Sequence, residues 1–210
     1  LEEKGIFSFF DREAAVGAEM PFDRAQVPLA PLSPAQTDAL EEVRRGFVSQ
    51  DCVLLYGVTG SGKTELYMHL MADALARGES VLYMMPEIAM TSQLVARVRS
   101  VFGSRVTLYH SRLGERRRAE IYRRLLASGG GELVLGVRSA LFLPLPSFGL
   151  VIVDEEHENT YKQQDPAPRY HARNAATVLA ALYGAKTLLG TATPSIETWH
   201  NAMSGKYGLV

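Results

Sequence analysis

The sequence predicts an α/β fold with a mostly parallel sheet flanked by helices on both faces. Between residues 32 and 210, short runs rich in Val, Leu and Ile alternate with longer stretches of helical pattern. The apolar runs lack polar alternation, which is typical of strands buried on both faces, and repeated strand–helix alternation favours a parallel sheet. Of the 210 residues, 47% are hydrophobic and 21% are charged, so the chain can bury one substantial core.

The first helix is predicted to begin at Pro34. Ser33 suits the N-cap, proline suits the first helical position, and Leu40, Val43 and Phe47 follow at helical spacing. The later strands are predicted at "CVLLY", "SVLYMM", "RVTLY", "ELVLG", "LVIVD" and "KTLLG". Helices are predicted at 63–77, 91–102, 114–127, 171–183 and 194–203.

Residues 1–31 differ from the remainder of the chain. An apolar cluster around Phe7 and Phe10 is followed by charged residues and then by Pro21, Pro28 and Pro31. Because prolines favour extended backbone, we expect 1–31 to be the end of a preceding module plus a proline-rich linker, and 32–210 to be one domain of a longer protein.

Composition also restricts the classes of function. The net charge of −1 gives no overall basic signature, so any contact with nucleic acid must come from local patches. A single cysteine, Cys52, excludes an internal disulfide framework or a multi-cysteine zinc site in this chain. No apolar run approaches the roughly 18 residues that span a bilayer, so we expect no membrane partner and an intracellular protein.

A phosphate-binding loop is predicted between the first strand and the helix at 63–77. The stretch "GVTGSGKT" fits GxxxxGK[ST] and has a strand before it and a helix after it. Glycines let several backbone N–H groups face one anion, and the helix N-terminus adds partial positive charge. We expect ATP to be bound by Gly57, Thr59, Gly60, Ser61, Gly62, Lys63 and Thr64.

A second group of residues is predicted to supply metal binding and water activation. "LVIVDEEH" ends a buried strand with Asp154 and Glu155, at the edge where parallel sheets present ligand-binding groups. Asp154 and Thr64 suit Mg²⁺, Lys63 suits the β- and γ-phosphates, and Glu155 suits polarisation of the attacking water. By itself this stretch could equally be a solvated acidic loop, but beside the phosphate loop it predicts ATP hydrolysis.

Several motifs in order resemble one helicase family. "GVTGSGKTELY", "MPEIAMTSQL", "YHSRLGERRRAEIY", "GVRSALFLP", "VDEEHENTYKQQDPAPRYHARNAA" and "GTATPS" are similar to the first motor lobe of the PriA family, the bacterial primosomal replication-restart helicases of superfamily 2. The resemblance covers about residues 32 to 205 and includes a DExH box, "DEEH". It implies a RecA-like P-loop NTPase lobe, and a winged-helix-like module at the start of 1–31.

The resemblance also implies roles for further nucleotide-site residues. Gln36 would recognise adenine, although an exposed polar helix residue is an equally good interpretation of the sequence. His157 would complete the catalytic set of Lys63, Asp154 and Glu155. It would link nucleotide state to Thr191 and Thr193, although Thr193 before Pro194 also suits a helix cap.

Residues for DNA contact and coupling are implied in three segments. The segment "PEIAMT" would contribute Pro86, Glu87 and Thr91, and "GVRSALFLP" would contribute Arg138 and Ser139; Val137 and Met90 depart from the family pattern. The loop after the acidic box mixes aromatic and basic residues, which can stack bases while neutralising phosphates, or its tyrosines could simply pack on the lobe. Its candidates are Tyr161, Lys162, Arg169, Tyr170, His171 and Arg173.

From the resemblance we expect an ATP-dependent 3′-to-5′ DNA helicase that acts in replication restart. Its cofactors would be ATP and Mg²⁺, with zinc elsewhere in the parent chain, and its partners single-stranded and forked DNA, a second lobe in cis and primosome proteins. The location implied is the bacterial cytoplasm, in association with the nucleoid. The isolated lobe would be nearly inactive, because the second lobe supplies an arginine that contributes about 10³ to 10⁵ in rate.

Two alternatives remain open. An ATP-gated DNA-binding or partner-loading module without unwinding activity would share these motifs. A small-molecule kinase would share the phosphate loop, but has no reason to carry "DEEH", "GTATPS" and the aromatic–basic loop together.

Overall fold

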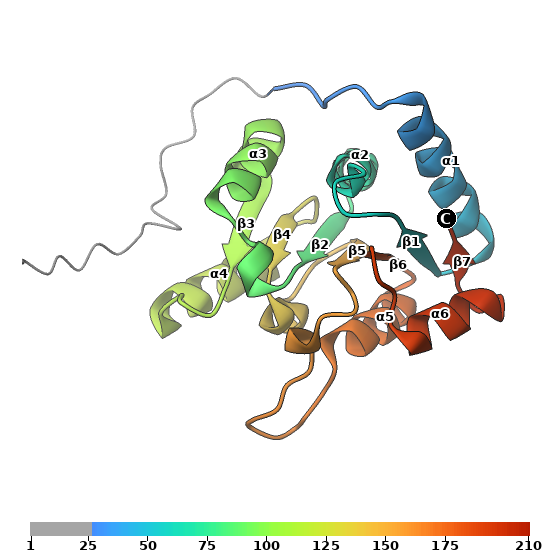
Figure 1. Cartoon of the computed structure of the whole chain (residues 1–210). Helices are drawn as coiled ribbons and strands as arrows, with labels where there is room; N and C mark the ends of the chain where they lie inside the picture. Colours follow the sequence, from blue (N-terminus) through green and yellow to red (C-terminus); the bar gives the residue numbers. More distant parts are fainter. Residues whose placement is uncertain (1–26) are drawn as a thin grey trace, which may run out of the picture.

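The computed structural model describes residues 27–210, which form a seven-stranded sheet between two layers of helices (Figure 1). The strand order is β3-β4-β2-β5-β6-β1-β7, and every neighbouring pair is parallel. The strands are β1 Cys52–Tyr56, β2 Ser80–Met84, β3 Val106–Tyr109, β4 Leu133–Gly136, β5 Phe148–Asp154, β6 Lys186–Thr191 and β7 Gly208–Leu209. The predicted α/β fold and parallel sheet are confirmed.

Helices cover both faces of the sheet, as predicted. Helices α1 (Pro34–Ser49), α2 (Lys63–Ala76) and α3 (Ser92–Phe102) contribute to one buried cluster. Helices α4 (Glu115–Ala127), α5 (Ala172–Tyr183) and α6 (Ile196–Met203) contribute to the other. Short 3₁₀ helices lie in the connections: η1 Glu87–Ala89, η2 Gly103–Arg105, η3 Arg138–Phe142 and η4 Asn159–Tyr161.

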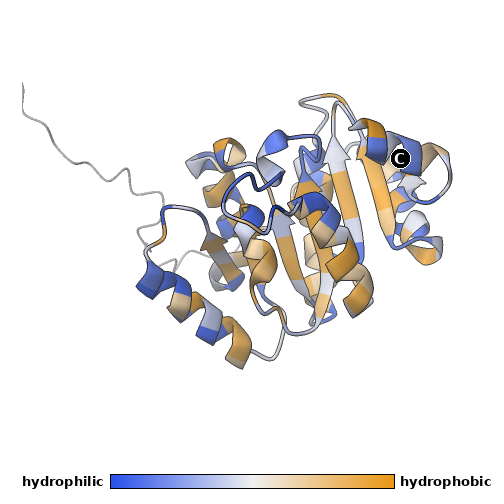
Figure 2. Ribbon diagram, turned by 90° about the horizontal axis from the view of Figure 1, so that it is seen from below, coloured by the Kyte–Doolittle hydropathy of each residue, from blue (hydrophilic) through white to orange (hydrophobic). Residues whose placement is uncertain are grey.

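Burial on both sides explains why the strands are continuously apolar. Within β1, Val53 and Leu55 belong to the α1–α3 cluster, whereas Cys52 and Leu54 belong to the α4–α6 cluster. Successive side chains of a strand point to opposite faces, so a strand covered on both faces has no position for a solvated side chain. Figure 2 shows the consequence: the central strands are mainly hydrophobic, whereas the helices carry both hydrophobic and hydrophilic residues.

Helix α1 begins where the sequence indicates. The Ser33 hydroxyl accepts a hydrogen bond from the Gln36 backbone N–H at 3.3 Å, and the Gln36 side-chain oxygen accepts one from the Ser33 N–H at 2.9 Å. This reciprocal capping box, with Pro34 next to it, satisfies donors that lack partners at a helix start.

Strand β7 was not predicted. Its residues pair with β1, and the Tyr56 N–H donates to the Val210 carbonyl at 2.8 Å. A two-residue strand has no apolar pattern of its own, so only its partner strand defines it.

The proposed module and linker at 1–31 lie mostly outside the described residues, and that division of the chain stays a prediction. Within residues 27–210, none of the helices combines the length and the hydrophobicity needed to cross a membrane.

The parallel arrangement places the carboxyl ends of all strands at one edge of the sheet. The segments that follow β1, β2, β4, β5 and β6 therefore emerge together, and each of them carries one of the motifs.

Candidate nucleotide and DNA-coupling site

The phosphate loop joins β1 to α2 and depends on two glycines with left-handed backbone. Gly60 has φ 79° and Gly62 has φ 85°, a region that side chains with a Cβ rarely adopt. At Gly62 a Cβ would also collide with the Gln36 amide nitrogen. Because α2 begins at Lys63, the N–H groups of Lys63 and Thr64 lack intrahelical acceptors and, with the helix dipole, favour an anion.

Lys63 places its cation inside this loop. Its amine donates to the Gly57 carbonyl at 2.6 Å and to the Val58 carbonyl at 3.2 Å, and the residue is only 9% exposed. The positive charge therefore lies within the phosphate loop, where it can add to the attraction of the loop N–H groups for a triphosphate.

Gln36 contacts the phosphate loop from α1. Its amide nitrogen lies 3.4 Å from both the Ser61 and the Gly62 carbonyl oxygens, while its side-chain oxygen accepts the Ser33 N–H. The residue is half-buried against the loop, and adenine recognition by Gln36 stays a prediction.

Asp154 ends β5 and is held by two tyrosines that the sequence did not single out. The Tyr67 hydroxyl donates to Oδ1 at 3.0 Å and the Tyr83 hydroxyl donates to Oδ2 at 3.2 Å. Burial raises the pKa of Asp154, and the two tyrosine hydrogen bonds and the Lys63 charge partly oppose that shift. Both tyrosines occupy apolar positions in their helix and strand, so their sequence pattern indicates only core packing.

The surroundings of Asp154 fit a magnesium ion. The Tyr83 hydroxyl interacts with the Thr64 side chain as well as with Asp154, so the two predicted ligands share a neighbour. In the part of the chain that the structure describes, no group of three or more His, Cys, Asp or Glu could hold a metal. Mg²⁺ usually takes one or two protein ligands and completes its shell with phosphates and water, so Thr64 and Asp154 suffice.

Glu155 has a strained backbone, with φ 47° in the left-handed region. Such strain is frequently associated with functional sites, where the surrounding structure enforces it. Burial and the neighbouring Asp154 raise the pKa of Glu155, whereas Lys63 and His157 oppose the shift. A raised pKa makes a carboxylate a better acceptor for a proton or a water hydrogen bond.

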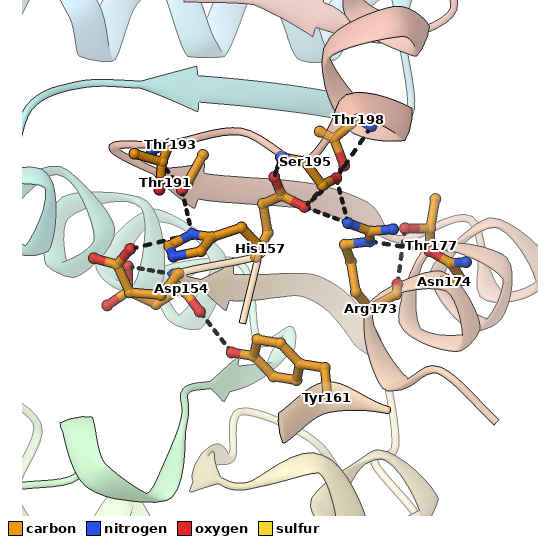
Figure 3. A network of polar contacts seen from close by, with 12 residues as sticks. Asp154, His157, Tyr161, Arg173, Asn174, Thr177, Thr191, Thr193, Ser195 and Thr198 are labelled. Atoms are coloured by element: carbon orange, nitrogen blue, oxygen red, sulfur yellow. Dashed lines mark hydrogen bonds and ion pairs between the residues drawn. The ribbon is translucent and has the colours of Figure 1, made fainter. Parts of the chain in front are cut away.

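His157 connects the acidic box to the segment after β6. Its Nδ1 lies 2.8 Å from the Thr191 hydroxyl oxygen and 3.6 Å from a Glu155 carboxylate oxygen (Figure 3). The Thr191 carbonyl in turn accepts the Gly57 N–H at 3.0 Å, which joins this segment to the phosphate loop. The structure thus brings His157 and Thr191 together, and their role in coupling stays a prediction.

Thr193 is exposed and does not cap α6. Its N–H donates to the Thr191 hydroxyl at 3.0 Å, whereas the cap of α6 is Ser195, whose hydroxyl accepts the Thr198 N–H. The capping interpretation of Thr193 is therefore wrong, because the helix begins two residues later than that cap requires.

The two segments implied in DNA contact follow neighbouring strands. Arg138 and Ser139 begin η3 after β4, and Glu87 begins η1 after β2. Glu87 is exposed and contacts Ser111, and Thr91 is exposed and caps α3. Pro86 is buried, so it can position Glu87 but cannot itself touch a DNA strand.

The aromatic–basic loop projects from the lobe between η4 and α5, as the long orange loop of Figure 1 shows. Its stem is a bridge between Lys162 and His171, and Arg138 donates to the Lys162 carbonyl at 3.1 Å. Lys162 and Arg169 are exposed, whereas Tyr170 is half-buried and packs edge-to-face on Phe142 at 5.0 Å between ring centroids. His171 is also half-buried. The loop thus presents cations to solvent beside Arg138.

Two loop candidates are not on this surface. Tyr161 is 1% exposed and its hydroxyl donates to the Asp154 carbonyl at 2.6 Å, so base stacking by Tyr161 is wrong and the packing interpretation is correct. Arg173 is 6% exposed and forms an ion pair with Glu156 at 2.6 Å, so it cannot contact a phosphate directly. Glu156 itself was missed, because the third position of the box carried no expected chemistry.

The comparisons with known proteins identify a helicase family. The model of the DEAD/DEAH box helicase family matches residues 33–202. The chain belongs to the DEAD/DEAH box helicase family. It is a motor lobe of that family, with the nucleotide motifs at the carboxyl edge of its sheet.

Similar proteins carry the name "Replication restart protein PriA". The one from Synechocystis sp. is 43% identical over 203 residues, which are 95% of this chain and 24% of that protein. The one from Bacillus subtilis is 40% identical over 86% of this chain and 22% of that protein. The predicted resemblance to the first helicase lobe of PriA is confirmed. The chain spans about a quarter of the length of these relatives.

Solved helicase structures share the fold. The helicase Lhr from Mycobacterium smegmatis, bound to ssDNA and AMP-PNP, superposes with a TM-score of 0.58 at 23% identity, over 86% of this chain and 25% of that one. The DUF1998 helicase MrfA, bound to DNA and AMPPNP, gives a TM-score of 0.58 at 19% identity, over 85% of this chain and 27% of that one. At these identities the likeness establishes the fold alone.

Proposed function

We propose that residues 32–210 are the first, ATP-binding motor lobe of a 3′-to-5′ DNA helicase that acts in replication restart. The observation that carries the proposal is the junction of three motifs at one sheet edge. Lys63 lies in the phosphate loop, Asp154 at the end of β5 and Glu155 directly after it interact electrostatically with Lys63, and His157 contacts Thr191 at the end of β6. The names of the PriA relatives support the replication-restart role.

The residues of the site divide the work of ATP hydrolysis. The loop N–H groups and Lys63 bind and orient the phosphates, and Thr64 and Asp154 would hold Mg²⁺, which would neutralise phosphate charge. Glu155 accepts a hydrogen bond from the attacking water and aligns it, because burial and the neighbouring Asp154 raise the pKa of its carboxyl group.

DNA would reach the lobe along the segments after β2, β4 and β5. Arg138, Lys162 and Arg169 can neutralise phosphates of a single strand, with Glu87 and Ser139 nearby on the same edge. Arg138 connects this surface to the loop stem, since it donates to both the Thr160 and Lys162 carbonyls. A DNA strand bound to Arg138 would therefore alter the position of the loop that follows the acidic box.

Further parts of the proposal concern the full-length protein. A second lobe would complete the nucleotide site, a zinc site would lie outside this chain, and forked DNA and replication-restart proteins would be its partners. The protein would act in the bacterial cytoplasm at the nucleoid. The isolated lobe is expected to turn over ATP very slowly, because the arginine of the second lobe is absent from it.

Strand displacement by the full-length protein tests this proposal. Duplexes with only a 3′ or only a 5′ single-stranded tail on the bound strand separate the two polarities, and we expect unwinding from the 3′ tail alone. Lys63→Ala and Glu155→Gln should abolish it. ATP hydrolysis without any strand displacement would instead support an ATP-gated DNA-binding or partner-loading module.

A further inference from the structure

Glu156 is a fully buried carboxylate with donors on both oxygens. Oε1 accepts the Ser195 N–H at 2.7 Å, and Oε2 accepts Arg173 Nη1 at 2.6 Å and the Thr198 hydroxyl at 2.9 Å. The Ser195 hydroxyl lies 3.1 Å from Oε2 and also accepts from Arg173. A buried charge persists only when it is paired and fully hydrogen-bonded, and Glu156 meets both conditions.

The partners of Glu156 come from two separate segments of the motor. Arg173 lies in the first turn of α5, two residues after His171, which closes the stem of the aromatic–basic loop. Ser195 and Thr198 lie at the start of α6, directly after the segment that holds Thr191 and Thr193. Figure 3 shows Arg173, Ser195 and Thr198 turned toward one another between the two helices.

Glu156 is also tied to the nucleotide site through its own backbone. Its N–H donates to the Gly190 carbonyl at 3.1 Å, and its chain neighbours are Glu155 and His157. The carboxylate therefore joins the start of α5, next to the loop stem, to the segment that contacts His157.

Stability alone does not account for such a pair. A buried ion pair often contributes no more to stability than well-packed apolar residues of the same volume, because desolvation offsets the attraction. The pair instead fixes the geometry of its partners, because charge-assisted hydrogen bonds hold Arg173, Ser195 and Thr198 in one arrangement. A shift of Arg173 must move the carboxylate or break these bonds.

We propose that Glu156 is a positioning residue that transmits displacement of the aromatic–basic loop, through Arg173, to the Ser195 end of the Thr191 segment. This inference rests on the proposed function, because it assumes that DNA at the loop stimulates ATP hydrolysis. Exposed Lys162 and Arg169 receive the DNA, Arg173 carries the movement inward, and Glu156 passes it to α6 and to Thr191 beside His157.

The test measures ATP turnover by the full-length protein as single-stranded DNA is added, for the wild type and for Glu156→Gln. The glutamine has nearly the same shape but loses the charge and sets an amide against Arg173. We expect basal turnover within about twofold of the wild type and DNA-stimulated kcat lowered about tenfold, within the usual range of coupling between sites. The DNA concentration for half-maximal stimulation should change less than about threefold, because DNA-facing residues are intact.

Two further variants separate positioning from stability. Thr198→Val removes the hydroxyl that donates to Glu156 and contacts the Ser195 hydroxyl, without changing charge, and should lower stimulated turnover less than Glu156→Gln does. Asp73→Asn breaks the Arg44–Asp73 pair between α1 and α2, which lie on the opposite face of the sheet from α5 and α6, and should leave stimulation unchanged.

The outcomes distinguish the inference from the proposed function. The inference alone would be overturned if folded Glu156→Gln kept wild-type stimulation by DNA. It would also be overturned if the basal and the stimulated rates of this variant fell by the same factor. A wild-type protein whose turnover ignores DNA would overturn the proposed function, and the inference with it.

Discussion

Substitution of Tyr161 separates burial from base stacking most sharply. The ring is 1% exposed, it belongs to the α4–α6 cluster, and its hydroxyl donates to the Asp154 carbonyl at 2.6 Å. Tyr161→Ala removes a large buried ring and should destabilise the lobe by about 3–5 kcal/mol. Tyr161→Phe loses only the hydrogen bond, which leaves a carbonyl with one partner fewer and should cost about 1–2 kcal/mol.

Thermal unfolding followed by circular dichroism measures both effects on the purified chain. For a domain of this size, about 2–4 °C of Tm corresponds to 1 kcal/mol, so we expect about 6–20 °C for Tyr161→Ala and about 2–8 °C for Tyr161→Phe. Tyr170→Ala is the matched control: this ring is half-buried against Phe142, and its loss should lower Tm by less than about 4 °C. An unchanged Tm for Tyr161→Ala would refute the burial argument and restore a surface role.

Three more predictions follow from single side chains. Gly190→Ala would drive a Cβ into the Tyr67 hydroxyl, so it should displace that donor from Asp154. We expect the free energy of unfolding, measured by urea titration, to fall by about 1–3 kcal/mol. Gly129→Ala is the control and should be close to neutral, because the added Cβ would meet no atom within 4 Å. Burial raises the native pKa of Asp154 above its ordinary value of 3.8, so the native state binds the carboxyl proton more tightly than the unfolded state does. Ionisation of Asp154 therefore lowers stability as pH rises from the unfolded pKa through the native pKa. Asp154→Asn should therefore be more stable than the wild type at neutral pH, with an advantage that shrinks toward acid, and a constant difference between the two melting curves across pH would exclude this linkage. Burial raises the pKa of the Cys52 thiol to about 12, so the native chain should react with a thiol reagent far more slowly than the unfolded chain at neutral pH, and equal rates would show that the thiol is accessible.

The sequence was sufficient for features that local pattern controls. The continuous apolar run before Asp154 and the glycine spacing around Lys63 define a buried strand and a phosphate loop without help from the remainder of the chain. Ser33, Pro34 and Gln36 likewise define the start of α1 within four residues. Parallel order then follows from alternation, since parallel strands need a helical crossover between them.

Features that depend on distant partners could not be predicted. Tyr67 meets Asp154 across 87 positions and Glu156 meets Ser195 across 39, and no local periodicity encodes either contact. Tyr161 and Arg173 belong to a segment whose composition suggests exposure. The Tyr161 ring is nevertheless buried in the α4–α6 cluster, and the Arg173 guanidinium is paired with Glu156. Burial of an aromatic or basic residue is decided by what the tertiary fold places opposite it.

ATP hydrolysis by the full-length protein, measured with and without single-stranded DNA, tests the central claim most directly. The account predicts slow basal turnover and strong stimulation by DNA, with both lost in Lys63→Ala and with hydrolysis lost in Glu155→Gln while nucleotide binding is retained. Turnover that is indifferent to DNA would leave an ATPase and contradict the motor. Turnover that survives in Glu155→Gln would contradict the assignment of this carboxylate to the attacking water.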